Sequence, residues 1–141
     1  MAIKNIGERL FVGLNAFLYR ISGGKVLGKI QGAPVLLLTT VGRKTGKART
    51  SPLLYLRDGD RYLVVGSHAG AQADPAWVHN LRAKPEAEIE IGKETIPVRA
   101  VELSAAESAP LWPRLDAMYA GYADYRTKTD RTFPVFALTR R

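Results

Sequence analysis

The chain contains no cysteine and only two histidines, His68 and His79, among its 141 residues. The absence of cysteine excludes disulfides, thiolate nucleophiles, iron–sulfur clusters and cysteine-based zinc sites. Two histidines would need unusual help from carboxylates to hold a catalytic metal, so the sequence predicts no metal. The chain also lacks an apolar run of the roughly 20 residues that span a membrane, and its start lacks the pattern of a secretory signal. These absences predict a cytoplasmic protein.

The excess positive charge of the chain is confined to its first third. Lysine and arginine number 21 against 13 acidic residues, which gives a net charge of +8. Residues 1–50 hold nine basic side chains and only Glu8, whereas residues 51–141 hold twelve of each sign. A local excess of this kind indicates an anionic site or a membrane-facing patch rather than a nucleic-acid-binding protein.

The length is that of a single domain with one core. Apolar residues recur at helical spacing over residues 4–21 and predict an amphipathic, basic N-terminal helix. This helix either caps the core or lies on an anionic membrane, and both interpretations stay open. We divide the chain into this helix with its connector, residues 1–29, and a main unit, residues 30–141.

The main unit is dominated by short apolar or alternating runs that predict strands. These runs cover residues 35–40, 51–56, 61–67, 87–91, 95–103 and 132–138. Asp58-Gly59 predicts a hairpin turn, so we expect the first three strands to be antiparallel neighbours. The chain is therefore predicted to be an α+β protein, a small antiparallel split β-barrel of about six strands with an N-terminal helix and short peripheral helices.

Helix signals lie between these strands. Asp74 followed by Pro75 predicts an N-cap for a helix that ends before Pro85. Ser104 with Glu107 forms the pattern of a capping box at the start of further short helical pieces.

The densest chemical signal is the loop of residues 39–50. Four cations, Arg43, Lys44, Lys47 and Arg49, fall within seven residues among hydroxyl side chains and two glycines. This composition is typical of a phosphate cradle, in which fixed donors supply geometry and cations offset the anionic charge. A nucleotide-binding P-loop is rejected because the glycine spacing is one residue short and the loop lies between two strands. An exposed basic hairpin without a ligand is the alternative.

Two further segments are candidates for a site. Small residues at 65–70 end a predicted strand and permit close approach of a flat ring to the backbone. Ser67 and His68 do not make a catalytic dyad, because adjacent side chains of an extended chain point in opposite directions. Three tyrosines recur every three residues from 119 to 125 and fan over one side of a helix, where they would line the mouth of a ligand pocket. Trp77 and His79 lie on the predicted short helix after Pro75. The alternative to a place in the site is the core for Trp77, and a structural role rather than one as an acid or base for His79.

Residues 38–54, Asp58-Gly59-Asp60, residues 74–77, residues 79–81 and the tyrosine triplet together resemble one family. The chain is similar to the deazaflavin-dependent nitroreductases of actinobacteria, which are split β-barrel proteins that use coenzyme F420. The resemblance extends over residues 30–138. Departures from the family pattern at His68, at Ala69 and over residues 76–78 predict a reshaped substrate pocket.

The resemblance implies an oxidoreductase in which reduced coenzyme F420 transfers a hydride to an electron-poor acceptor, which is a quinone, an activated enone or a nitro compound. The basic loop would hold the phosphate and polyglutamate tail, and the strand-end segment would lie against ring and tail. The implied coenzyme-binding residues are Thr39, Arg43, Lys44, Thr45, Gly46, Lys47, Arg49, Gly66, Ser67, His68, Ala69, Gly70, Trp77 and Tyr122. Tyr119 and Tyr125 are the implied substrate contacts, and Tyr122 and Tyr125 the candidates for orienting the acceptor.

Two alternatives from the residues alone stay open. A flavin mononucleotide enzyme on a similar barrel would also need a phosphate cradle. A non-enzymatic module that binds anionic lipid or another anionic ligand would explain the N-terminal charge. The aromatic residues are not interleaved with the basic loop, which disfavours a binder of single-stranded nucleic acid.

Overall fold

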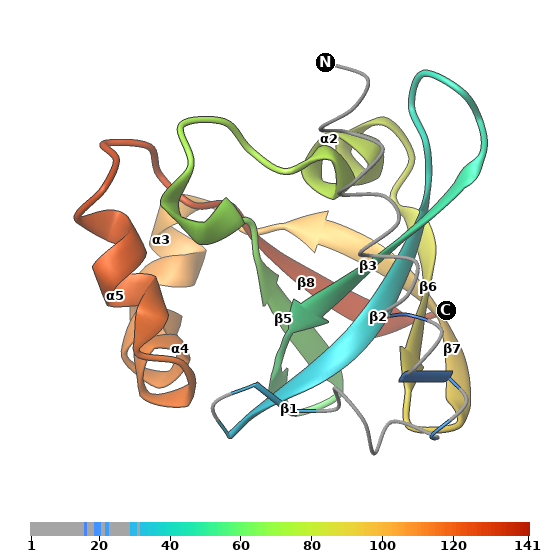
Figure 1. Ribbon diagram of the computed structural model, residues 1–141, viewed down its shortest axis with the longest axis horizontal. Helices are drawn as coiled ribbons and strands as arrows, with labels where there is room; N and C mark the ends of the chain where they lie inside the picture. Colours follow the sequence, from blue (N-terminus) through green and yellow to red (C-terminus); the bar gives the residue numbers. More distant parts are fainter. Residues whose placement is uncertain (1–15, 17–18, 21, 23–28, 31) are drawn as a thin grey trace.

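The computed structural model describes residues 16, 19–20, 22, 29–30 and 32–141 (Figure 1). Of the predicted N-terminal helix, Ala16, Tyr19 and Arg20 are helical, and the rest lies outside the described residues. The Tyr19 hydroxyl lies 3.1 Å from the carbonyl oxygen of Val35, and Arg20 forms a bidentate pair with the Glu90 carboxylate. These contacts join the described part of the N-terminal region to the sheet.

Eight strands form one antiparallel sheet in the order β1-β2-β6-β7-β8-β5-β4, and β3 pairs with β2 off this path. The strands are β1 (Lys29–Ile30), β2 (Ala33–Val41), β3 (Ala48–Leu54), β4 (Leu56–Asp58), β5 (Arg61–Val65), β6 (Glu86–Ile91), β7 (Glu94–Glu102) and β8 (Val135–Arg140). The helices are η1 (His68–Gly70), α2 (Ala76–Ala83), α3 (Ala105–Ser108), η2 (Ala109–Leu111), α4 (Trp112–Met118) and α5 (Gly121–Arg126).

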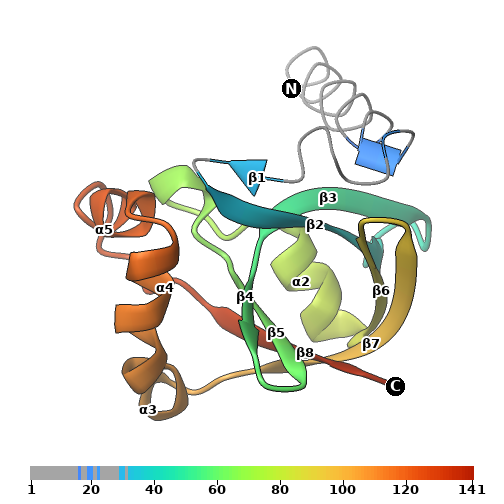
Figure 2. The same ribbon diagram turned by 90° about the horizontal axis from the view of Figure 1, so that it is seen from below.

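The sheet curls around helix α2, which lies within the outline of the strands when the molecule is seen from below (Figure 2). Helices α3, α4 and α5 gather on one outer side of the sheet (Figure 1). This arrangement confirms the predicted split-barrel α+β fold. The sheet has two more strands than the six expected, because β1 and β4 are only two and three residues long.

The central strands are buried on both faces, which explains their continuous apolar runs. In β2, Leu36 and Leu38 face the barrel interior, where Trp77 of α2 also packs. On the other face of β2, Leu37 packs in a small cluster with Ala16 and Tyr19. Strand β5 behaves alike, with alternate residues in the interior and in a second cluster beneath α4 and α5. Each run therefore separates two apolar layers.

Two predicted connections are wrong in detail. Strand β3 pairs with β2 as expected, but the predicted strand is interrupted at Tyr55, whose N–H donates to the Pro34 carbonyl. The Asp58-Gly59 hairpin joins β4 to β5 instead, and the second neighbour of β5 is β8. The last strand begins at Val135 rather than Thr132 and continues to Arg140.

Of the two helix caps predicted from the sequence, one is confirmed and one is wrong. The capping box is confirmed, since the Ser104 hydroxyl accepts from the Glu107 N–H and the Glu107 carboxylate accepts from the Ser104 N–H. The predicted Asp74 cap is wrong, because Pro75 occupies the N-cap position of α2 and Asp74 pairs with two arginines. Among the helices within the described residues, none is long and apolar enough to cross a membrane.

Candidate functional site

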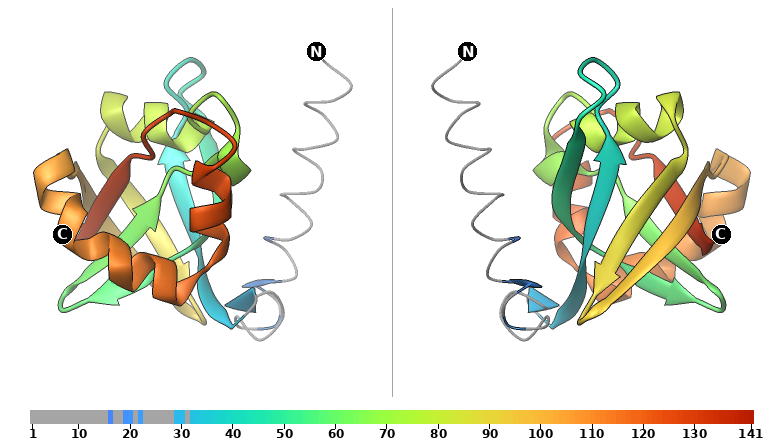
Figure 3. Two further views of the ribbon diagram at one scale, coloured as in Figure 1. Left: turned by 90° about the vertical axis from the view of Figure 1, so that its left-hand side faces the viewer. Right: turned by 90° about the vertical axis from the view of Figure 1, so that its right-hand side faces the viewer.

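The basic loop between β2 and β3 is a closed turn with its own hydrogen bonds. The Gly42 N–H donates to the Lys47 carbonyl at 2.8 Å, and the Gly46 N–H donates to the Gly42 carbonyl at 2.7 Å. Within the turn, the Thr45 hydroxyl accepts from the Lys47 N–H at 3.2 Å. At its base, the hydroxyl oxygens of Thr39 and Thr50 lie 2.8 Å apart across the strand pair. The sequence therefore folds into a defined hairpin end that extends past the sheet (Figure 3).

The cations of this loop have no acidic partner in the part of the chain that the structure describes. Arg43, Lys44 and Lys47 are exposed, and Arg49 is half-buried. The ion pairs found among the described residues use other arginines. Four basic groups on one hairpin, none of them neutralised by a described carboxylate, create a local positive potential that favours a multiply charged anion.

Asn80 joins this loop to helix α2. Its side-chain oxygen accepts from the Arg43 N–H at 3.0 Å, and its side-chain nitrogen donates to the Thr40 hydroxyl at 3.0 Å. Asn80 is 5% exposed and Thr40 is 1% exposed, so both groups depend on each other for hydrogen bonding. Sequence analysis did not assign Asn80 a role, because a helical asparagine has no local signal that identifies its distant partner.

The strand-end segment 66–70 runs close to two other parts of the molecule. A Cβ at Gly66 would lie 2.8 Å from Val78 Cγ2 on α2, so a larger residue does not fit there. Gly70 has φ +80°, and a Cβ there would lie 2.9 Å from the Tyr125 carbonyl oxygen. His68 also has a positive φ of 47° and is exposed, with Nδ1 3.1 Å from the Ala73 carbonyl oxygen. Ser67 is buried, and Ala69 lies in the backbone turn of η1.

The tyrosine triplet forms a cluster at the junction of α4 and α5. The hydroxyl oxygens of Tyr119 and Tyr125 lie 2.8 Å apart. The ring of Tyr122 packs edge-on against Tyr119, with centroids 5.1 Å apart, and is 3% exposed. Burial raises the pKa of the Tyr122 phenol, and its hydroxyl makes no hydrogen bond with another described residue. The cluster therefore holds two bonded phenols and one free hydroxyl.

Helix α2 carries the remaining candidates. Trp77 is 5% exposed and packs edge-on against Phe136 in the barrel interior, with ring centroids 5.7 Å apart. Its implied place beside a chromophore stays a prediction. His79 is half-buried on the same helix.

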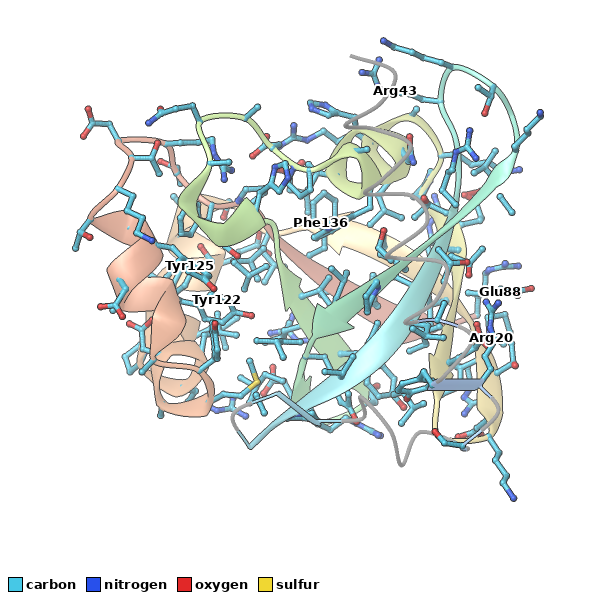
Figure 4. The ribbon with its side chains drawn as sticks, in the orientation of Figure 1. Arg20, Arg43, Glu88, Tyr122, Tyr125 and Phe136 are labelled. Atoms are coloured by element: carbon cyan, nitrogen blue, oxygen red, sulfur yellow. The ribbon has the colours of Figure 1, made fainter. Side chains whose placement is uncertain are left out.

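Contacts connect these segments into one region. The basic loop contacts α2 through Asn80, α2 contacts the strand end at Gly66, and η1 contacts α5 at Gly70. Figure 4 shows Arg43 on the loop and Tyr122 and Tyr125 on α5, on either side of the segment that contains η1. The structure thus brings the cation loop and the small-residue segment to one end of the barrel, with the tyrosine cluster beside η1.

The chain matches proteins of known activity. A family model described as F420H(2)-dependent quinone reductase matches residues 12–140. The F420H(2)-dependent quinone reductase Rv1261c of Mycobacterium tuberculosis is 40% identical over 142 residues, which cover 98% of this chain and 95% of that protein. The chain belongs to this family. The resemblance seen in the sequence is confirmed at the level of an F420-dependent reductase, with quinone as the acceptor in the family description.

Solved structures agree with this membership. An F420-H2 dependent reductase, FDR-A, is 37% identical with a TM-score of 0.68, over 74% of this chain and 93% of that chain. A structure described as a domain-swapped dimer is 31% identical with a TM-score of 0.70, over 96% of both chains. Family membership accounts for the fold and indicates a redox coenzyme with an anionic tail.

Sequence analysis missed Arg131, which has the largest set of hydrogen bonds around the strand-end segment. It lies in an irregular stretch between α5 and β8, where one arginine among many gives no local pattern. Within the described residues, no three histidine, aspartate or glutamate side chains gather as a metal site.

Proposed function

We propose that this protein is a reductase that transfers a hydride from reduced coenzyme F420 to a quinone. The observation that carries the proposal is the basic loop, whose cations have no acidic partner among the described residues and lie at the same end of the barrel as the strand-end segment. Family membership supplies the identity of the coenzyme.

The residues present fit such a coenzyme. Its phosphate and polyglutamate tail are polyanionic, and Arg43, Lys44, Lys47 and Arg49 offer four cationic donors to it. A guanidinium binds phosphate or carboxylate oxygens through two parallel hydrogen bonds, whereas an ammonium acts as a compact charge. Thr39, Thr45 and Gly46 complete the proposed cradle. When bound, the coenzyme supplies the hydride from ring carbon C5, and the protein supplies binding, orientation and exclusion of water.

The strand-end segment and the tyrosine cluster have complementary roles in this proposal. Residues 66–70 lie against the ring and tail of the coenzyme, because small side chains permit approach to the backbone. Trp77 supports this region from the core. Tyr122 and Tyr125 orient the acceptor, and Tyr119 holds Tyr125 through the hydroxyl pair. Reduction of a quinone to a hydroquinone needs a hydride and one proton, so a phenol at this place holds that proton near an acceptor oxygen.

The range of acceptors is a finer part of the proposal. Activated enones and nitro compounds are electron-poor as quinones are, and they would compete for the same hydride. The apolar surroundings of Tyr122 favour flat, uncharged acceptors over anionic ones.

The direct test is a fluorescence titration of the full chain with oxidised F420, with flavin mononucleotide in parallel. Saturable binding of F420 at concentrations where flavin mononucleotide does not bind is the expected result. Turnover of F420H2 with a soluble quinone then identifies the activity. Preference for flavin mononucleotide, or binding of neither, would contradict the proposal.

We also propose that residues 30–141 form the coenzyme-binding unit and residues 1–29 an accessory helix with its connector. A cytoplasmic location and contact of the N-terminal helix with an anionic membrane belong to this proposal as expectations. Sedimentation with vesicles containing anionic lipid tests the second, and equal sedimentation with neutral vesicles would contradict it.

A further inference from the structure

The guanidinium of Arg131 gathers backbone carbonyls from the strand-end segment. Its Nε donates to Ala71 at 2.9 Å, its Nη1 to Gly66 at 3.0 Å and its Nη2 to Ser67 at 2.7 Å. Nη1 also pairs with the carboxylate of Asp74. The Arg131 side chain is only 12% exposed. One cation thus fixes three carbonyl oxygens that lie within six residues of chain.

This arrangement constrains the segment more than a single hydrogen bond would. Four of the five N–H groups of a guanidinium are used, and their planar fork sets the three carbonyl oxygens relative to one another. A buried cation is costly unless it is paired and hydrogen-bonded, so loosening one carbonyl leaves charge unsatisfied. The Arg131 side chain also lies over the Phe133 ring, 4.9 Å from its centroid, which limits its movement.

A second set of bonds holds Arg131 itself in place. The Arg131 N–H donates to the Thr129 hydroxyl at 3.1 Å, and that hydroxyl donates to the Gln72 side-chain oxygen at 2.9 Å. The stretch between α5 and β8 is therefore bonded along its length to residues 66–74. Helix α5 carries Tyr125 and contacts Gly70, so Arg131 lies beside the junction of the strand-end segment and α5.

We propose that Arg131 is a positioning residue for the coenzyme, acting through the backbone of residues 66–71. This inference rests on the proposed function. The carbonyl and N–H of a trans peptide point in opposite directions. Drawing the Gly66 and Ser67 carbonyls to the guanidinium therefore turns their oxygens away from the other side of the segment, where the next N–H groups point. A segment whose Gly66 and Ser67 carbonyl oxygens face the guanidinium accepts a polyanionic coenzyme on its other side with less repulsion.

The test is Arg131→Lys in the full chain, because lysine keeps the charge but cannot bond all three carbonyls. Hydrogen exchange of residues 66–71 in the coenzyme-free protein should accelerate, while exchange in the sheet stays as in wild type. The Kd for oxidised F420 should rise about tenfold or more. The KM for F420H2 should rise in parallel, and kcat at saturation should change less than about threefold.

Arg114→Gln is the matched control. The Arg114 guanidinium also binds a carboxylate, Asp58 at 2.7 Å, and lies 3.4 Å from the Arg57 carbonyl oxygen, but on the β4–β5 hairpin. This variant should keep wild-type affinity and wild-type exchange at residues 66–71. Loss of affinity in Arg114→Gln equal to that in Arg131→Lys would overturn the inference.

The outcomes separate the two proposals. No affinity of the wild type for F420 overturns the proposed function. Wild-type affinity or wild-type local exchange in Arg131→Lys overturns the positioning role and leaves the function standing. If Arg131→Lys does not fold, Asp74→Asn replaces it, since this change removes the carboxylate that holds the guanidinium against the three carbonyls and so should loosen those bonds. Faster local exchange with weaker binding supports the inference, and unchanged values for both overturn it.

Discussion

The side-chain oxygen of Asn80 accepts a 3.0 Å hydrogen bond from the backbone N–H of Arg43, which fixes the first cationic residue of the basic loop to helix α2. The same amide donates to the buried Thr40 hydroxyl. Asn80 therefore sets where the loop leaves the sheet, although it carries no charge for an anion.

Asn80→Ala should lower both stability and coenzyme affinity. The change leaves the Arg43 N–H and the Thr40 hydroxyl without their partner, so the free energy of unfolding should fall by about 1 to 3 kcal/mol. The Kd for oxidised F420 should rise as the loop loses its attachment. Thr40→Val is the companion variant, because it removes only the second bond. It should lose stability and keep affinity, and equal weakening of binding in both variants would show that Asn80 does not position the loop.

Arg43→Ala and Lys44→Ala should each weaken coenzyme binding with little effect on folding. Both side chains are exposed, and a charge-assisted hydrogen bond contributes about 1 to 3 kcal/mol to binding. The loss should shrink as salt rises, because screening already weakens the wild-type contact. Lys93→Ala is the control, since Lys93 is an exposed cation in the turn between β6 and β7, at the other end of the sheet in Figure 1. Affinity that is unchanged in both loop variants would remove the loop from the site.

Local sequence signals predicted the parts of the site but not their connections. The basic loop, the small-residue segment and the tyrosine triplet are each visible as a composition or a spacing within about a dozen residues. Asn80 bonds to Arg43, which lies 37 positions away in the chain, and Arg131 bonds to groups that lie 57 to 65 positions away. Nothing near Asn80 or Arg131 in the sequence identifies those partners. The mistaken Asp74 cap has a related origin, because Asp74 pairs with Arg131, 57 positions away, and with Arg82, while Pro75 takes the N-cap position.

The fold shows a similar division. The apolar runs identified β2 and β5 because each is buried on both faces. The break at Tyr55 was not visible, since it depends on a bond to the Pro34 carbonyl across the sheet. Pairing of β5 with β8 joins residues 70 to 78 positions apart, and periodicity carries no information about such partners.

Tyr122→Phe should lower turnover more than coenzyme affinity. Among the described residues no group bonds the Tyr122 hydroxyl, so its removal should change the free energy of unfolding by less than about 1 kcal/mol. If the hydroxyl orients the acceptor, kcat/KM for the quinone should fall about tenfold. Tyr62→Phe is the control, because Tyr62 is a buried phenol whose hydroxyl accepts from Arg57 outside the site. Equal losses of turnover and coenzyme affinity in Tyr122→Phe would show that Tyr122 only lines the site and does not orient the acceptor.

Tyr125 should make the stability of the protein depend on alkaline pH. The hydrogen bond to Tyr119, followed by burial, raises the pKa of Tyr125 from 10.0 to about 12. Between these values the unfolded chain releases the phenolic proton while the folded chain keeps it, so rising pH favours unfolding. The stabilisation is complete below pH 10.0 and is lost as the pH passes through about 12.

Urea unfolding of wild type and Tyr125→Phe, from about pH 9 to about pH 11, measures this contribution as a difference in slope. Alkaline groups away from the Tyr119–Tyr125 pair titrate alike in both proteins and cancel. The wild type should lose stability more steeply than the variant. Identical slopes would mean that the hydroxyl pair does not persist in solution. In that case Tyr119 would not hold Tyr125 toward an acceptor, and the proposal that Tyr125 orients the acceptor would be contradicted.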